Sequence, residues 1–203
     1  MSESPFAPLN GSKPAPRAPP ASADDWRVVT PVPADAPKPP DRHPKLGKPS
    51  AVWTYRDEDG AVSGYACRYD SKGEKQFRPL VLYRSADGTL AWRYEAWPVP
   101  RPLYGLDHLA ARPQAPVLIC EGEKAADAAQ RLLPGFVCIT SPNGAKSTAK
   151  ADWTPLRGRV VVIWPDDDEA GDGYAKTVAK LVLEAGALSV AIVSPKATAR
   201  EGA

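Results

Sequence analysis

The chain has 203 residues, and its 26 lysine and arginine residues nearly balance its 24 aspartate and glutamate residues, which leaves a formal charge of +2 at neutral pH. This balance excludes nucleic-acid binding through the field of the whole protein, so any such affinity must come from local patches. The three cysteines form no CxxC pair and only two histidines occur, which argues against a zinc site. No apolar run approaches the roughly 20 residues of a membrane span, and no signal-peptide pattern is present, so we expect a cytoplasmic protein that does not contact membranes.

Residues 1–50 are rich in proline, with 13 of the 24 prolines and only isolated apolar residues between them. A segment of this composition buries too little apolar surface to offset the entropy that it loses on ordering. We therefore expect a disordered, partly polyproline linker. The stretch WRVV at 26–29 is its one apolar island, and we expect it to make a transient contact only.

Residues 51–112 form short alternating runs separated by turn signals, among them the Asp-Gly dipeptides at 59–60 and 87–88. Glycine takes up the positive φ of a tight hairpin turn, so these dipeptides predict an antiparallel β meander. Acids occupy the turns, while arginines such as Arg84 and Arg93 occupy the strands. This pattern fits a sheet face that contacts nucleic-acid phosphates, and it fits equally an ordinary solvated face on which arginine stems cover apolar surface.

From residue 113 onward, unbroken apolar runs alternate with helical periodicity, which is typical of a parallel sheet covered on both faces. The carboxyl ends of parallel strands meet at one edge, where ligand-binding loops gather. The sequence therefore predicts an α/β protein in which a small parallel-sheet domain, residues 113–203, follows the antiparallel β region. The expected strands are 116–120, 136–140, 160–164 and 188–193, and the expected helices are 124–133 and 174–185.

Acidic side chains follow two of these expected strands. Glu121 stands at the tip of the first, and Asp166 and Asp168 belong to the run PDDDEAG after the third. Like charges so close repel, and a hard divalent cation such as Mg²⁺ would neutralise them, bound by one or two carboxylates, water and substrate phosphate. The simpler alternative is that Asp168 or Glu169 caps the following helix while the other acids are solvated. The matching position of Glu121 favours the metal site.

The stretches VLICEGEKAADAA and VVVIWPDDDEAGDGYA resemble the two signature motifs of the Toprim domain, which occurs in bacterial and phage primases, type IA and type II topoisomerases and some nucleases. Other segments, such as SPNGAKSTAKADWTPLRGR and PRPLYGLDHL, look more narrowly like the primase-helicase proteins of phages, plasmids and integrated elements. The resemblance covers roughly residues 51–195. It implies that Glu121 acts in acid-base catalysis, that Asp166 and Asp168 bind Mg²⁺ or Mn²⁺, and that Gly144 forms the glycine turn after the second strand.

The chain departs from the primase-helicase pattern in two respects. It contains no GxxxxGK[ST] phosphate-binding loop, and no cysteine-rich zinc ribbon precedes the catalytic part. We therefore expect the primase-type portion of such a machine, truncated before its helicase domain. A helicase domain or subunit encoded downstream is the expected partner.

The function implied by the resemblance is Mg-dependent nucleotidyl transfer that makes RNA primers on a DNA template, in replication of a phage, plasmid or integrated element. Lys124, Lys146 and Gly144 are candidate contacts to phosphate or nucleic acid near the acidic edge, and Arg84 and Arg93 are candidates on the β region. For each of the two lysines, an ordinary surface position is the favoured interpretation. Two alternatives remain open: a Toprim nuclease, which uses the same acids with water as nucleophile, and a non-catalytic DNA-binding or adaptor module.

Overall fold

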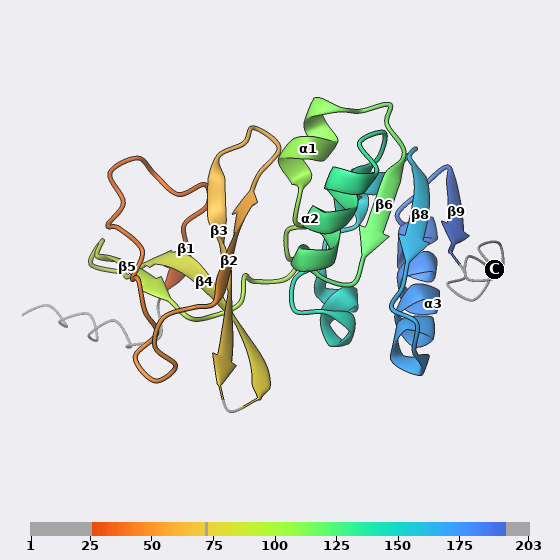
Figure 1. Ribbon diagram of the computed structural model, residues 1–203. Coiled ribbons are helices and arrows are strands. Elements are labelled where there is room, and N and C mark those ends of the chain that lie inside the picture. The colour runs from red at the N-terminus through yellow and green to blue at the C-terminus, as the bar shows by residue number, and fades with distance from the viewer. Residues whose placement is uncertain (1–25, 72, 194–203) are drawn as a thin grey trace, which may run out of the picture.

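The computed structural model describes residues 26–71 and 73–193, except the side chains of Ser71, Ala145 and Lys146. Within these residues the chain forms a five-stranded antiparallel sheet and a separate four-stranded parallel sheet. The two sheets lie side by side, with helix α2 between them (Figure 1). The expected α/β class, in which a small parallel sheet follows an antiparallel β region, is confirmed.

The antiparallel sheet has the strand order β1-β4-β3-β2, and β5 also pairs with β4. Gly60 and Gly88 have φ values of 80° and 89°, so both Asp-Gly dipeptides form the tight turns that the sequence predicts. Aromatic side chains dominate the buried core of this sheet, where Trp53, Tyr55 and Trp97 belong to one cluster. The strands are β1 (Arg27–Val28), β2 (Ala51–Arg56), β3 (Val62–Ser71), β4 (Glu74–Arg84) and β5 (Leu90–Arg93).

The segment 26–50 differs from the expected linker, because it packs on this sheet. Its strand β1 pairs with β4, and the guanidinium of Arg93 lies 5.0 Å from the ring centroid of Trp26. The indole of Trp92 donates a hydrogen bond of 2.7 Å to a backbone carbonyl of the same segment. The ring of Trp26 and a few backbone groups are enough to hold the segment 26–50 on the sheet, because the sheet supplies a cation for the ring and hydrogen-bonding partners for the backbone. Residues 1–25 lie outside the described part of the chain.

The parallel sheet has the strand order β7-β6-β8-β9, and every neighbouring pair of strands is parallel. Its strands match the four expected runs to within a residue or two. Helix α3 begins five residues before the expected start at 174, because Asp168 caps it. The elements are α1 (Leu106–Ala111), β6 (Val117–Cys120), α2 (Glu123–Leu132), β7 (Val137–Ile139), the short 3-10 helices η1 (Ala145–Lys150) and η2 (Thr154–Leu156), β8 (Val160–Trp164), α3 (Glu169–Glu184) and β9 (Ser189–Ile192).

Helices α2 and α3 cover opposite faces of the parallel sheet. Successive side chains of a strand point to opposite faces, and in β6 Val117 and Ile119 pack in the cluster of α3, while Leu118 and Cys120 pack in that of α2. The chain therefore turns to one face of the sheet after β6, where α2 follows, and to the other face after β8, where α3 follows. The strand order reverses between β6 and β8, and the carboxyl ends of two such strands are the position at which sheets of this type bind ligands.

Candidate functional site

The predicted acidic residues meet at the carboxyl ends of β6 and β8. Glu121 follows β6 directly, and its Oε1 accepts a hydrogen bond of 3.0 Å from the backbone N–H of Asp166, in the loop after β8. Burial raises the pKa of the Glu121 carboxyl, and the charges of Asp166 and Asp168 raise it further, while the hydrogen bond from Asp166 opposes them. The structure thus brings Glu121 together with acids that lie 45 residues or more away in sequence.

Gly171, in the first turn of α3, makes this close approach possible. A Cβ atom at this position would lie 2.2 Å from the carbonyl oxygen of Asp166 and 2.8 Å from Oε1 of Glu121. The helix terminus therefore packs directly on the acidic loop, and a larger residue would displace it. The sequence reasoning did not single out Gly171. A glycine inside a helix, where alanine is favoured by about 1 kcal/mol, is the signal that could have identified it.

Asp168 is the N-cap of α3, as the simpler sequence-based alternative expected. Its Oδ1 accepts a hydrogen bond of 2.7 Å from the backbone N–H of Gly171. Its second carboxylate oxygen accepts no hydrogen bond from any described residue. Asp166, Asp167 and Asp168 are all exposed. Capping therefore occupies one oxygen of Asp168 and leaves the other available for a ligand.

The donor set fits an open cation site and does not form a closed cage. Among the described residues, no group of three or more Asp, Glu, His or Cys side chains is placed to hold a metal ion by itself. Mg²⁺ needs no such cage, since it takes one or two carboxylates and fills its other positions with water and substrate phosphate. The exposed carboxylates of Asp166 and Asp168 are hard oxygen donors of this kind.

A cavity of about 510 Å³ lies beside Glu121, where the two sheets face each other. The parallel unit contributes Glu121, Glu123 and Gly144, and strand β4 contributes Phe77 and Arg78. Gly144 has φ 62° and ψ −163°, a backbone conformation that is restricted almost entirely to glycine. Gly144 therefore forms a glycine turn after β7, as the resemblance implied, and it lines the cavity of Glu121.

Lys124, Arg84 and Arg93, three of the other predicted contact residues, do not line this cavity. Lys124 lines a different cavity, between α2 and β2. Arg84 and Arg93 are absent from the lining around Glu121, and the Arg93 guanidinium forms an ion pair of 2.6 Å with Glu95. Lys146 belongs to η1, but its side chain is outside the part of the structure that is described.

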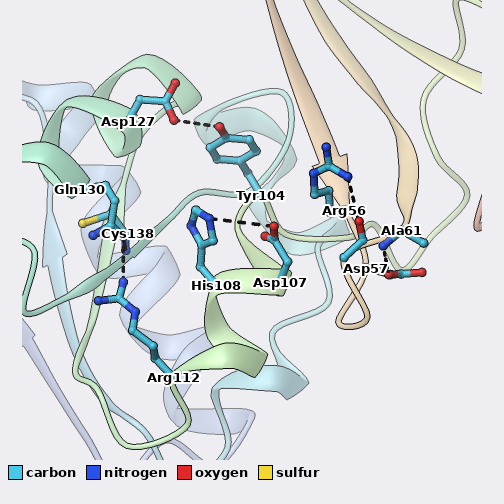
Figure 2. A network of polar contacts seen from close by, with 11 residues as sticks. Arg56, Asp57, Ala61, Tyr104, Asp107, His108, Arg112, Asp127, Gln130 and Cys138 are labelled. Carbon is cyan, nitrogen blue, oxygen red and sulfur yellow. Dashed lines mark hydrogen bonds and ion pairs between the residues drawn. The ribbon is translucent and has the colours of Figure 1, made fainter.

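Two hydrogen bonds hold α2, and with it the turn after Glu121, against the antiparallel sheet, and a third joins α2 to Tyr104 in the connection between the sheets. The hydroxyl of Tyr55 donates to Oε1 of Glu123 at 2.8 Å. Asp127 accepts from Trp53 Nε1 at 3.0 Å and from the hydroxyl of Tyr104 at 2.8 Å, a contact seen in Figure 2. Glu123 is only 7% exposed, and burial raises the pKa of its carboxyl.

The sequence reasoning missed these five residues. Tyr55 stands 68 residues before Glu123, and Glu123 occupies the first turn of a helix, where an exposed acid is common. No local pattern therefore marks either residue.

Within residues 26–71 and 73–193, no helix combines the length and the apolar character that crossing a membrane requires.

Comparisons with known proteins give one family model and several solved structures, two of which follow. The family model described as Domain of unknown function (DUF6371) matches residues 45–167. No curated protein matches the chain. The Aquifex aeolicus primase (zinc-binding and RNA polymerase domains) is 19% identical with a TM-score of 0.48, over 71% of this chain and 34% of that one. The DnaG catalytic core is 16% identical with a TM-score of 0.43, over 74% of this chain and 48% of that one.

The chain thus spans about a third of the first structure's length and about half of the second's. Because both TM-scores lie below 0.5, neither likeness assigns an activity to the chain.

Proposed function

The chain belongs to the DUF6371 family, and we propose that it is a Toprim-type nucleotidyl-transfer protein that makes RNA primers on a DNA template with Mg²⁺ or Mn²⁺. The observation that carries the proposal is the contact of Glu121 with the acidic loop 166–168 at the carboxyl ends of β6 and β8. The resemblance of both motifs to the Toprim signatures supports it. Residues that carry chemistry gather at this edge of parallel sheets.

The proposed roles follow from the placement of each carboxylate. Asp166 and Asp168 would hold the cation, which when bound stabilises negative charge on the phosphate oxygens. In the transfer step, the hydroxyl oxygen of one nucleotide forms a bond to the α-phosphorus of the next, and the bond from that phosphorus to pyrophosphate breaks. The hydroxyl proton moves to Glu121. A carboxyl whose pKa is raised by burial is a better proton acceptor than an exposed one.

The neighbouring structure keeps Glu121 in position. The backbone N–H of Asp166 fixes one of its oxygens, and the hydroxyl of Tyr174 in α3 donates to the carbonyl of Cys120 at 2.9 Å. The first turn of α3 lies beside the acids, and Asp168 caps it. The cavity of about 510 Å³ beside Glu121 lies in the size range of nucleotide-sized ligands.

The proposed partners are a DNA template, nucleotides, and a helicase domain or subunit encoded nearby. A direct test incubates the protein with Mg²⁺, ribonucleotides and end-labelled single-stranded DNA, adding that helicase where a neighbouring gene encodes one. We expect new RNA primers from the unmodified protein. Glu121→Gln should retain the circular dichroism spectrum and lose primer synthesis by roughly 10²- to 10⁴-fold, because it keeps the shape and loses the proton acceptor. Glu58→Gln, at an exposed acid, is the matched control.

Each result of this experiment decides between functions. Equal primer yield from Glu121→Gln and the unmodified protein would contradict the catalytic role of Glu121. Shortening of the labelled DNA, lost in Glu121→Gln, would identify a nuclease that uses the same acids. DNA binding without any reaction, with and without Mg²⁺, would identify a non-catalytic adaptor.

A further inference from the structure

A second cavity, of about 650 Å³, lies between β2 and α2, with walls from β3 and α1 as well. Glu121 and the acidic loop do not line it. Figure 2 shows part of its wall, with Arg56 from β2, His108 from α1 and Asp127 from α2 around Tyr104. This cavity is distinct from the site of the proposed function.

Helix α2 separates the two cavities. Successive residues of an α-helix point about 100° apart, so Glu123 lines the cavity of Glu121, while Lys124 lines the second cavity. Arg131 also lines the second cavity and follows Lys124 by seven residues. At a rise of 1.5 Å per residue, these two cations stand on one stripe of the helix, about 10.5 Å apart along its axis.

The acids in this lining already have partners. Asp127 accepts from both Trp53 and Tyr104. The Arg68 guanidinium forms an ion pair of 2.9 Å with Asp70. The remaining acid, Asp107, lies 3.9 Å from Nε2 of His108.

The helix cations and Arg56 have no comparable partner. Neither Lys124 nor Arg131 has an ion-pair partner among the described residues. Arg56 donates a hydrogen bond to the carbonyl of Gly60 at 2.8 Å, and it forms no ion pair with an acid among the described residues. Three cationic side chains from two elements therefore line one cavity without an ion pair among the described residues. The lining as a whole carries four lysine and arginine side chains against three acidic ones, so positive charge is in excess.

We propose that this cavity binds a phosphate group of a nucleotide or of a single-stranded nucleic acid, with Lys124 and Arg131 as the principal contacts. Lysine and arginine on a common stripe are the donors that phosphate oxygens attract. Val52, which is 50% exposed and lines the same cavity, offers apolar surface to a sugar or base. The volume is in the range of nucleotide-sized ligand sites.

The test measures binding without catalysis, so its outcome is independent of the acidic site. Two probes are titrated in EDTA: dTMP by calorimetry, and a fluorescein-labelled oligo(dT) by anisotropy at several salt concentrations. The variant Lys124→Gln/Arg131→Gln is compared with Lys176→Gln/Lys180→Gln, which removes the same charge from exposed positions of α3. Thermal melting of both variants verifies that they are folded.

The affinity of Lys124→Gln/Arg131→Gln for the oligonucleotide should fall at least tenfold. Its salt slope should decrease by about 1.4, because each phosphate that the protein no longer neutralises lowers the slope by about 0.7. A matching fall in affinity for dTMP identifies a site for a free nucleotide phosphate. A fall for the oligonucleotide alone identifies the backbone of a strand. Equal affinities of the two variants for both probes, or no binding of either probe by the unmodified protein, would overturn the proposal.

Discussion

The two sheets of this protein have cores of different side chains and different structural roles. Aromatic residues such as Trp53 and Tyr55 form the core of the antiparallel sheet, whereas aliphatic residues such as Val117 and Ile163 fill the parallel one. Aromatic side chains carry polar tips that seek partners when buried, and those tips reach α2 across the junction. The antiparallel sheet therefore positions the helix, while the parallel sheet presents the acids at its strand ends.

Charge is also distributed differently in the two regions. The parallel unit concentrates exposed acids in the loop 166–168 and at Glu169, the first residue of α3. The antiparallel sheet spreads its arginines along the strands, and two of them pair with nearby acids, Arg68 with Asp70 and Arg93 with Glu95. Exposed ion pairs of this kind contribute little to stability, but they reduce the attraction of those arginines for an external phosphate. Lys124 and Arg131 of α2 form no such ion pair among the described residues, so they are more available to an external phosphate.

The largest expected effect tests the contact between α3 and the acidic loop. Gly171→Ala places a Cβ atom against the backbone of Asp166, so we expect a decrease of about 3 kcal/mol in the free energy of unfolding, measured by urea denaturation. Gly173→Ala, in the same helix, meets no atom within 4 Å and should be neutral or stabilising by up to about 1 kcal/mol. Equal effects of the two substitutions would show that the close approach at Gly171 does not constrain the site.

The next effect tests whether the aromatic sheet holds α2. Tyr55→Phe removes the donor to the buried carboxylate of Glu123 and should cost about 2 kcal/mol, because hydrogen bonds to charged groups are the stronger class. Tyr83→Phe removes a bond to a neutral carbonyl, that of Ala96, and should cost about 1 kcal/mol. Hydrogen exchange of the α2 amides should accelerate in Tyr55→Phe and not in Tyr83→Phe. Unchanged exchange in both would contradict the positioning role.

A smaller effect tests how far the antiparallel sheet extends toward the N-terminus. Trp26→Ala removes the ring that packs on the sheet beneath Arg93 and should lower the free energy of unfolding by about 1 kcal/mol. Lys38→Ala, at an exposed position of the same segment, should leave it unchanged. An unaltered melting temperature in Trp26→Ala would restore the view that this segment is a linker.

The smallest effect concerns pH and the acids of the parallel unit. Burial and the charges of Asp166 and Asp168 raise the pKa of Glu121 in the folded state. The folded protein therefore binds more protons than the unfolded chain between the ordinary and the raised pKa, and this contribution to stability is lost as pH rises through that window. Asp166→Asn removes one like charge and should lower the pKa of Glu121, measured by NMR titration.

The stability of Asp166→Asn at neutral pH should rise slightly, by about a degree in Tm or less, since the group is partly solvated. Asp167→Asn is the charge-matched control, because the charge of Asp167 is not among the causes of the Glu121 shift. An equal change in the pKa of Glu121 in both variants would mean that Asp166 affects this pKa through the net charge of the protein and not through its closeness to Glu121.

The sequence by itself determined the strands, the turns and the acids that follow the strands. Unbroken apolar runs predicted β6 to β9 because strands covered on both faces need apolar residues at every position. The dipeptides at 59–60 and 87–88 predicted hairpin turns because glycine takes their positive φ at no steric cost. Glu121 and Asp168 were identifiable as strand-end acids from local spacing alone.

Only the tertiary structure decided which of these pieces meet. The order β7-β6-β8-β9, which makes the ends of β6 and β8 neighbours, depends on packing between segments and not on any local pattern. The need for glycine at 171 depends on a backbone atom of Asp166, and the burial of Glu123 depends on Tyr55. Such contacts join residues far apart in the chain, so their energies appear only once the fold has formed. The docking of Trp26 on the sheet has the same cause, since composition describes a segment and not the surface that receives it.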